Sequence, residues 1–466
     1  MNKRNLLVKF VMYDLLAAII VWILFMLFRR TVNDAQIFEN IRIFIPNYNY
    51  FTSLLIFPLA CVFIHFLSGF YLHPEKQSQA SGFFSTLAAS AIISTAIFFI
   101  LMLDDIVVSY QYYYYSLLVL FGLLFLITFV FRSFIIAQIN QNYKTKKWCI
   151  NTIIIGTGVN ANKIAEELKA NSKRNTVVGF VSVDHHSSVP AQQILGSINQ
   201  IDTIISENKV EEAIIALENA DEQKLFSYIN CLYRYNIDIR FTPRLYEILT
   251  GSARINTMGM SPLVSITTLN MPDWEVSIKR FLDIVIAAIA MVVLLPFFIY
   301  FAFRIKRDSK GPVFYKQKRI GYLGKTFNIL KFRTMYIDAE NGIPKLSSSN
   351  DERITNFGRM LRKYRLDELP QFWNILKGDM SLVGPRPERE YYINQIIEDA
   401  PYYCLLYKIR PGLTSWGPIK IGYSDTIDKM VERLNYDIVY IENMSLLTDL
   451  KILILTIEIL FKGKGI

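Results

Sequence analysis

Two adjacent carboxylates are the clearest chemical feature of the C-terminal half. Asp367 and Glu368 lie in the segment LRKYRLDELPQFW, residues 361–373. Adjacent acidic residues can simply begin a solvated helix, because the N-terminal end of the helix dipole favours negative charge. They can also bind a divalent cation or act as nucleophiles. No histidine occurs after His186, which excludes histidine-based acid–base catalysis and histidine-ligated zinc from this half. Carboxylates remain as its candidate groups.

Basic residues gather before this pair. The stretch GPVFYKQKRIGYLGKTFNILKFRTM, residues 311–335, predicts a hairpin around GYLG. Its cations are Lys316, Lys318, Arg319, Lys325, Lys331 and Arg333, and those next to the carboxylates are Arg362, Lys363 and Arg365. Such charges are usually solvated. Beside a membrane-inserted element, however, the same cluster would hold a lipid phosphate and a cytoplasmic anion near one another.

The element that must position these charges at a membrane is the apolar run 284–303, which is long enough to span a bilayer. Pro296 lies inside it, where a missing N–H and a ring clash would kink a helix. A fifth span would carry the rest of the chain to the far side, whereas a bent helix would return it to the same side. The flanks carry Lys279 and Arg280 before the run and Arg304, Lys306, Arg307 and Lys310 after it. Basic flanks on both sides favour a re-entrant helix at about 281–303.

The N-terminal third predicts a membrane domain. A hydrophobic content of 52% over 466 residues exceeds that of most soluble proteins. Runs of about 20 apolar residues predict four spans, at 10–28, 51–72, 83–103 and 113–131. Basic residues before the first span and after the fourth span favour a cytoplasmic location for both ends of this domain. Asp14 lies inside the first span, where it is either a functional candidate or close enough to the membrane surface to reach water.

Beyond residue 148, short apolar strands alternate with helical stretches, which predicts a parallel, Rossmann-like sheet. NTIIIGTGVNANKIAEEL indicates a strand, a glycine turn and a helix. Gly156 and Gly158 could place backbone N–H groups against a phosphate, with Asp184 beside a ribose. Ala161 replaces the third glycine of the fingerprint, so a structural, regulatory or dimerising domain is the alternative. The four scattered cysteines show no metal or disulfide spacing and indicate a reducing compartment.

Several ordered motifs of the C-terminal part carry a resemblance: SIKRFLD, GPVFYKQKRIG, FNILKFRTM, LRKYRLDELPQFWNILKGDMSLVGPRPERE and IRPGLTSWGP. Together they resemble the bacterial sugar transferases, monotopic polyprenyl-phosphate hexose-1-phosphate transferases that start surface glycan synthesis. The whole chain is similar in architecture to the long-form members. The resemblance implies a four-helix transmembrane domain at 1–147, a Rossmann-like cytoplasmic α/β domain with linker at 148–262, and a membrane-associated α+β catalytic domain with the re-entrant helix at 263–466.

The resemblance also implies a reaction. A hexose 1-phosphate passes from a UDP-hexose to undecaprenyl phosphate with release of UMP, as the first membrane step of exopolysaccharide, capsule or O-antigen synthesis. The enzyme would lie in the inner membrane, in contact with its lipids, with the catalytic domain on the cytoplasmic face. A homodimer is compatible with this and no nucleic-acid partner is expected. The alternative is a non-catalytic membrane scaffold or nucleotide sensor of glycan assembly, in which the carboxylate pair is only structural.

By the family pattern, Asp367 is the nucleophile that forms an acyl-phosphate, and Glu368 is its partner near Mg²⁺. Both carboxylates are therefore expected metal ligands, since Mg²⁺ prefers hard oxygen ligands. We expect the phosphate and nucleotide ends of the substrates at Arg362, Lys331, Arg333, Pro385, Arg386 and Pro387. Pro296 matches the helix-breaking proline of the family, although Leu295 precedes it where the family often has serine.

Overall fold

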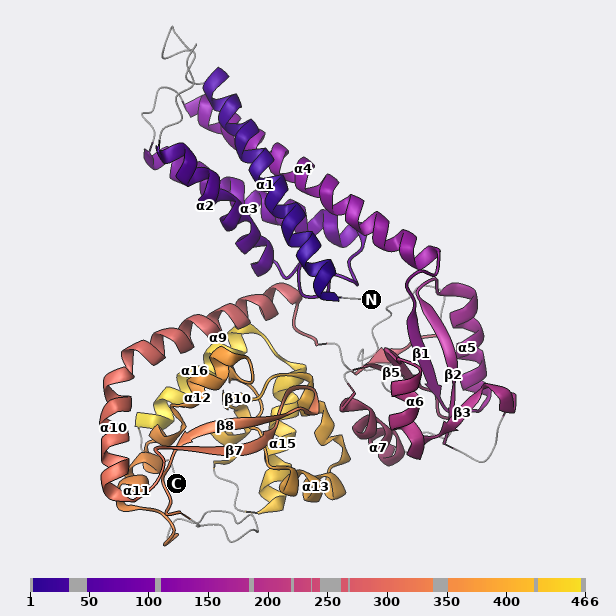
Figure 1. The fold of residues 1–466 in the computed structure, drawn as a ribbon, viewed down its shortest axis with the longest axis vertical. Helices are drawn as coiled ribbons and strands as arrows, with labels where there is room; N and C mark the ends of the chain where they lie inside the picture. Colours follow the sequence, from indigo (N-terminus) through magenta and orange to yellow (C-terminus); the bar gives the residue numbers. More distant parts are fainter. Residues whose placement is uncertain are drawn as a thin grey trace. The chain divides into compact units, whose positions relative to one another are not determined.

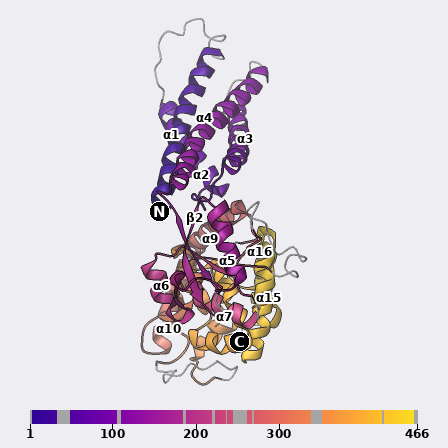
Figure 2. The same ribbon diagram turned by 90° about the vertical axis from the view of Figure 1, so that its right-hand side faces the viewer.

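The computed structural model describes most of the chain as two compact units (Figures 1 and 2). The described residues are 3–32, 48–104, 110–183, 188–218, 222–235, 237–243, 261–266, 269–337, 351–422 and 426–461. One unit consists of residues 1–148 with 272–278, and the other of residues 149–271 with 279–466. Asp184, expected beside a ribose, lies outside the described residues.

The first unit is built from α1 (Lys3–Val32), α2 (Tyr48–Leu67), α3 (Gln79–Asp104) and α4 (Tyr110–Lys144). In this unit α1 packs against α2 and α4, and α3 packs against α4. Three of these helices, α1, α3 and α4, are long and apolar enough to cross a bilayer, which confirms long apolar helices at three of the predicted spans. The apolar part of α2, Thr52–Leu67, is shorter and contains Pro58.

A buried ion pair joins α1 to α4. Arg132 donates from Nε to Asp14 Oδ1 at 2.9 Å and from Nη2 to Oδ2 at 2.6 Å. The hydroxyl of Tyr71 donates to Asp14 at 2.7 Å, and Arg132 also donates to Thr86 on α3 at 3.0 Å. The Arg132 guanidinium lies 3.8 Å from the centre of the Phe70 ring. Asp14 therefore does not reach water, as one interpretation of the sequence allowed, but is held inside the helical unit.

The second unit begins with a six-stranded sheet in the order β3-β2-β1-β4-β5-β6. The strands are β1 (Ile150–Ile155), β2 (Asn175–Ser182), β3 (Ile194–Ser197), β4 (Glu212–Ile215), β5 (Asp238–Phe241) and β6 (Val264–Ser265). All neighbours pair in parallel except β5 and β6. This is the strand order of a Rossmann fold in which the last edge strand is short and antiparallel, and it confirms the predicted parallel α/β sheet.

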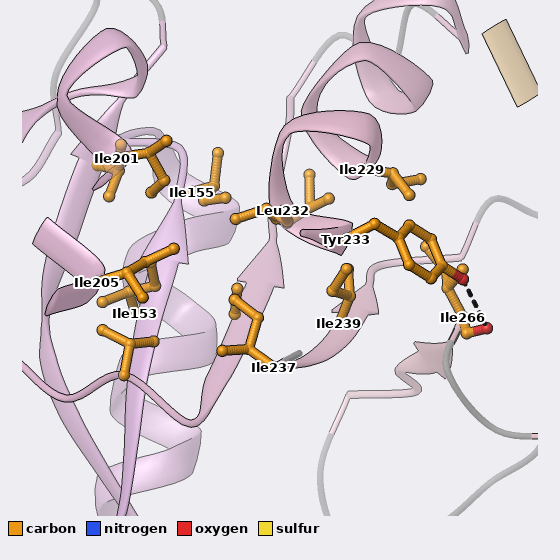
Figure 3. Close-up of a cluster of buried hydrophobic side chains, with 14 of the residues drawn as sticks. Ile153, Ile155, Ile201, Ile205, Ile229, Leu232, Tyr233, Ile237, Ile239 and Ile266 are labelled. Carbon is orange, nitrogen blue, oxygen red and sulfur yellow. Dashed lines mark hydrogen bonds between the residues drawn. The ribbon is translucent and has the colours of Figure 1, made fainter. Parts of the chain in front are cut away.

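Helices cover both faces of the sheet because its central strands are apolar on both sides. Ile154 points to the face covered by α5 (Val159–Asn171). Ile153 and Ile155 point to the opposite face, where they join a core with α6 (Ile201–Glu207) and α7 (Glu222–Tyr233). Figure 3 shows this second core, in which the Tyr233 hydroxyl points to the carbonyl of Ile266.

The C-terminal segment opens with α9 (Asp273–Val293) and α10 (Leu295–Asp308), which meet at a bend of 60°. Pro296 is in the first turn of α10, so the break occurs where the missing proline N–H predicts it. An antiparallel hairpin of β7 (Phe314–Ile320) and β8 (Thr326–Phe332) follows. Its core against α10 and α11 (Asn356–Lys363) consists of Phe301, Ile305, Phe332, Phe357 and Leu361.

The remainder of this segment is helical around a short parallel pair, β9 (Ser381–Val383) and β10 (Gly412–Thr414). The elements are η5 (Leu366–Glu368), α12 (Gln371–Lys377), α13 (Glu390–Asp399), η6 (Pro401–Lys408), α14 (Trp416–Ile421), α15 (Ile427–Glu442) and α16 (Leu446–Phe461).

The sheet and the C-terminal segment share one core through α7 and η6. Cys404 of η6 is fully buried in the same hydrophobic cluster as the strand residues of the sheet. Ring pairs Phe226–Tyr402 and Tyr233–Tyr407 lie 6.1 and 6.0 Å apart between centroids. The side chain of Asn230 donates to the Pro401 carbonyl at 2.7 Å.

Candidate active site

The carboxylate pair lies on a single 3₁₀ turn, η5, between α11 and α12. The chain reverses into this turn at Arg365, whose φ of +54° is in the left-handed region, uncommon for a residue other than glycine. Asp367 and Glu368 are each only 8% exposed. A solvated helix start would leave them open to water, so burial argues against that interpretation. Two charged groups this deeply buried require neighbouring cations.

Glu368 is the carboxylate to which these cations donate. Lys331 Nζ from β8 lies 2.7 Å from Glu368 Oε1, and Arg386 Nη2 from the loop after β9 lies 3.0 Å from the same oxygen. Burial alone would raise the pKa of Glu368. Arg386, Lys331 and Arg365 outweigh burial and hold this pKa well below its usual range. Glu368 is therefore ionised at neutral pH.

Asp367 has the opposite tendency. Burial raises its pKa above the usual range and the charge of Glu368 adds to the increase, while Lys331, Arg362 and Arg386 oppose it. The side chain of Arg362 is held by a hydrogen bond from its Nε to the Thr334 hydroxyl at 2.9 Å. The pair thus combines a carboxylate that the neighbouring cations hold ionised with one whose ionised form burial disfavours.

Arg386 lies on a loop that is held in place by ion pairs of Glu388, two residues further along the chain. Glu388 accepts from Arg319 of β7 at 2.9 Å and forms a second ion pair with Arg433 of α15. Arg319 also donates to the Pro387 carbonyl at 3.1 Å. The sequence did not identify Glu388 and Arg433 as part of the site. The available signal was their position, since Glu388 follows the Pro-Arg-Pro motif directly and Arg433 lies on the buried face of α15.

The structure brings Lys331, Arg362 and Arg386 to the carboxylates, but uses Arg333 elsewhere. Arg333 donates to the carbonyls of Ser309 at 2.6 Å and Lys310 at 2.9 Å, just beyond the last turn of α10. Carbonyl groups at a helix end need hydrogen-bond donors. Arg333 fills this role at the end of α10 and therefore does not contact the carboxylates. Pro385 and Pro387 flank Arg386, and Pro296 lies at the α10 bend rather than at the site.

A pocket of about 410 Å³, part of it open to solvent, borders the pair through Arg365 and Arg386. Its other lining residues are Gly412, Leu413, Thr414, Ser415, Pro418, Ile419, Thr456 and Ile459. A lining that combines Arg365 and Arg386 with apolar side chains suits an anionic group with a less polar body. The arrangement as a whole can neutralise phosphate charge beside a pair of carboxylates.

Two family models match this chain. A model described as bacterial sugar transferase matches residues 274–463, which include the whole carboxylate site. A model described as CoA-binding domain matches residues 67–243.

Several curated proteins are also similar to this chain. A "UDP-N-acetylgalactosamine-undecaprenyl-phosphate N-acetylgalactosaminephosphotransferase" of Aeromonas hydrophila is 36% identical over 49% of this chain and 54% of the relative. A "UDP-glucose:undecaprenyl-phosphate glucose-1-phosphate transferase" of Caulobacter vibrioides is 36% identical over 44% of this chain and 80% of the relative. An "Uncharacterized sugar transferase" of Haemophilus influenzae is 31% identical over 68% of this chain and 70% of the relative.

The chain spans somewhat more than half the length of several of its curated relatives, 54%, 60% and 58% for three of them. The Caulobacter and Haemophilus relatives are covered over most of their length at above 30% identity. With the motif order, the carboxylate site and the family model in agreement, the chain belongs to the bacterial sugar transferase family.

Proposed function

We propose that this protein transfers a hexose 1-phosphate from a UDP-hexose to undecaprenyl phosphate and releases UMP. The observation that supports this best is the buried pair in which Lys331 and Arg386 neutralise Glu368 while Asp367 is left as the destabilised carboxylate. The names of the Aeromonas and Caulobacter relatives describe this class of reaction. Such a transfer would be the first membrane step of exopolysaccharide, capsule or O-antigen synthesis.

The proposed chemistry has two displacements. An Asp367 oxygen attacks the phosphorus bonded to the sugar, the phosphorus–oxygen bond to the uridine-bearing phosphate breaks, and UMP leaves with that electron pair. An oxygen of the lipid phosphate then attacks the same phosphorus, and the bond to Asp367 breaks. Lys331, Arg362 and Arg386 offset the negative charge that collects around phosphorus in both steps.

Mg²⁺ fits this site as a proposed cofactor. Among the described residues no cluster of three or more acidic, histidine or cysteine side chains could enclose a metal. Asp367 and Glu368, which are adjacent on η5, would be its protein ligands, in agreement with the preference of Mg²⁺ for one or two carboxylates together with substrate phosphates and water. Bound there, Mg²⁺ would neutralise the diphosphate of the UDP-hexose.

A UMP-release assay tests the proposal. Purified protein in lipid nanodiscs receives UDP-glucose or UDP-N-acetylgalactosamine, with and without undecaprenyl phosphate. We expect many turnovers of UMP only when the lipid phosphate is present. A scaffold or nucleotide sensor would release none with any of the UDP-hexoses named for the relatives, and that result would overturn the proposal.

We also propose that α9 and α10 form a re-entrant element, that α1 to α4 all span the inner membrane, and that the catalytic segment faces the cytoplasm. Exposed apolar side chains line both arms of the bend, among them Ile289, Val292, Val293, Phe297, Ile299 and Phe303. The exposed apolar face of α16 consists of Leu447, Leu450, Ile454 and Ile457. An ion pair between Lys279 and Asp449 fastens α16 to α9, so we assign both apolar surfaces to membrane lipid.

This topology predicts that Lys173, in the sheet domain, and Lys310, just after α10, lie on the same side of the membrane. Each exposed lysine is replaced by cysteine in a background without the native cysteines. An impermeant maleimide should leave both variants unlabelled in intact cells and label both after permeabilisation. Labelling of Lys310→Cys alone in intact cells would mean that α9 and α10 together cross the bilayer.

The pH dependence of the reaction provides another prediction. Only ionised Asp367 can attack, so activity is lost as the pH falls through its raised pKa. Lys331 lowers that pKa more than any other group, so Lys331→Met should move the acidic limb of kcat/KM to higher pH. The matched control is Lys377→Met, because the Lys377 side chain is 63% exposed. An acidic limb unchanged in Lys331→Met would contradict the assignment of the limb to Asp367.

A further inference from the structure

The glycine turn that resembles a nucleotide-binding fingerprint is filled by atoms of the protein itself. Gly156 has a φ of +123°, and a side chain there would collide with the carbonyl oxygen of Ala216 at the end of β4. At Gly158 an added Cβ would collide with the side chain of Glu218. Close packing against β4 and its following loop therefore accounts for both glycines. Neither glycine requires a ligand to explain it.

Glu218 also occupies the place where such a fold would receive a phosphate. A glycine, Gly158, is the N-cap of α5 and offers no side-chain oxygen to the free N–H groups of the first turn. The Glu218 carboxylate accepts the N–H of Val159, the first residue of α5. In dinucleotide-binding folds the pyrophosphate lies at this helix end, attracted by the same N–H groups and the same dipole.

We propose that Glu218 is an internal anion that closes the glycine turn, so that this domain does not bind the phosphates of CoA or of a nucleotide there. The CoA implied by the family model does not fit the turn, because its pyrophosphate would need the N–H group that Glu218 holds and would face the negative charge of Glu218. Ala161, fully buried against the sheet in place of the third glycine, is consistent with a turn that packs on protein. This inference is independent of the transferase reaction.

Glu218→Ala tests the proposal in full-length protein in nanodiscs. Removal of the carboxylate leaves the first turn of α5 uncapped, and we expect the melting temperature to fall by about 2–4 °C. The vacated turn should then accept an anion, so millimolar CoA or inorganic pyrophosphate should restore part of the loss. The wild-type protein should show no shift with either probe. Glu211→Ala is the matched control, because Glu211 is an exposed glutamate that directly precedes the first residue of β4.

Two observations together support the proposal: wild type without response, and Glu218→Ala with a lowered melting temperature that CoA or pyrophosphate raises. Saturable binding of CoA to the wild-type protein, with an affinity that Glu218→Ala does not improve, would overturn it. Glu218→Ala protein that fails to respond to either anion would overturn it as well, because the turn would then be no anion site at all.

Discussion

Asp367→Asn should abolish transferase turnover, with a loss on the order of 10³-fold or more, while the protein keeps its fold. The amide has nearly the same shape as the carboxylate but cannot supply the anion that attacks phosphorus. The neighbouring cations donate to Glu368, so the substitution leaves both ion pairs of the site in place. UMP release and formation of the lipid-linked sugar measure the loss, and the melting temperature monitors the fold.

A labelling experiment separates covalent transfer from direct attack by the lipid phosphate. Protein is mixed with UDP-hexose radiolabelled in the sugar, without undecaprenyl phosphate. The covalent route leaves stoichiometric label on the wild-type chain, and none on Asp367→Asn. Asp399→Asn is the matched control, because Asp399 is an exposed aspartate at the end of α13 and should label normally. An active enzyme that never carries label would limit Asp367 to metal binding.

Asp14→Ala should destabilise the helical unit by about 3–5 kcal/mol, because it leaves the Arg132 guanidinium buried without its counter-charge. Both side chains of the pair are fully buried. The free energy of unfolding in bicelles measures the change. Met12→Ala on the same helix, at an exposed position, should cost far less.

The double variant Asp14→Ala/Arg132→Ala gives a sharper test. If the pair acts as a unit, the second substitution removes the isolated charge, and the combined loss should be smaller than the sum of the single losses. Additive losses would show that the two residues contribute separately, which the direct hydrogen bonds between them argue against.

Local patterns were enough to predict much of the architecture. Apolar length located the N-terminal helices, strand–helix alternation indicated the parallel sheet, and Pro296 marked the bend between α9 and α10. The signals for these features lie in residues close together in the chain, although the strands of the sheet pair over longer distances. They could therefore be predicted without knowing which elements meet in space.

The site was only partly predictable, because its side chains meet across long stretches of chain. From the order of the motifs we expected Lys331, Arg386 and Glu368 at one site, and the structure places both cations in contact with Glu368. Charge alone could not show that Arg333 would serve the end of α10. For the same reason the sequence could not show that the glycine turn packs on Glu218, which is some sixty residues away in sequence.

The core shared by α7 and η6 limits how freely the parts of this protein can be exchanged by recombination. A sheet domain taken from a relative would have to bring side chains that fit Tyr402, Cys404 and Tyr407, or leave that surface open to water. The segment η6 leads directly into β10, whose residues line the pocket beside Arg386. A poor fit at η6 would therefore displace part of the pocket lining. The sheet and the catalytic segment should therefore be inherited as one block, and a crossover between residues 243 and 273 should be selected against.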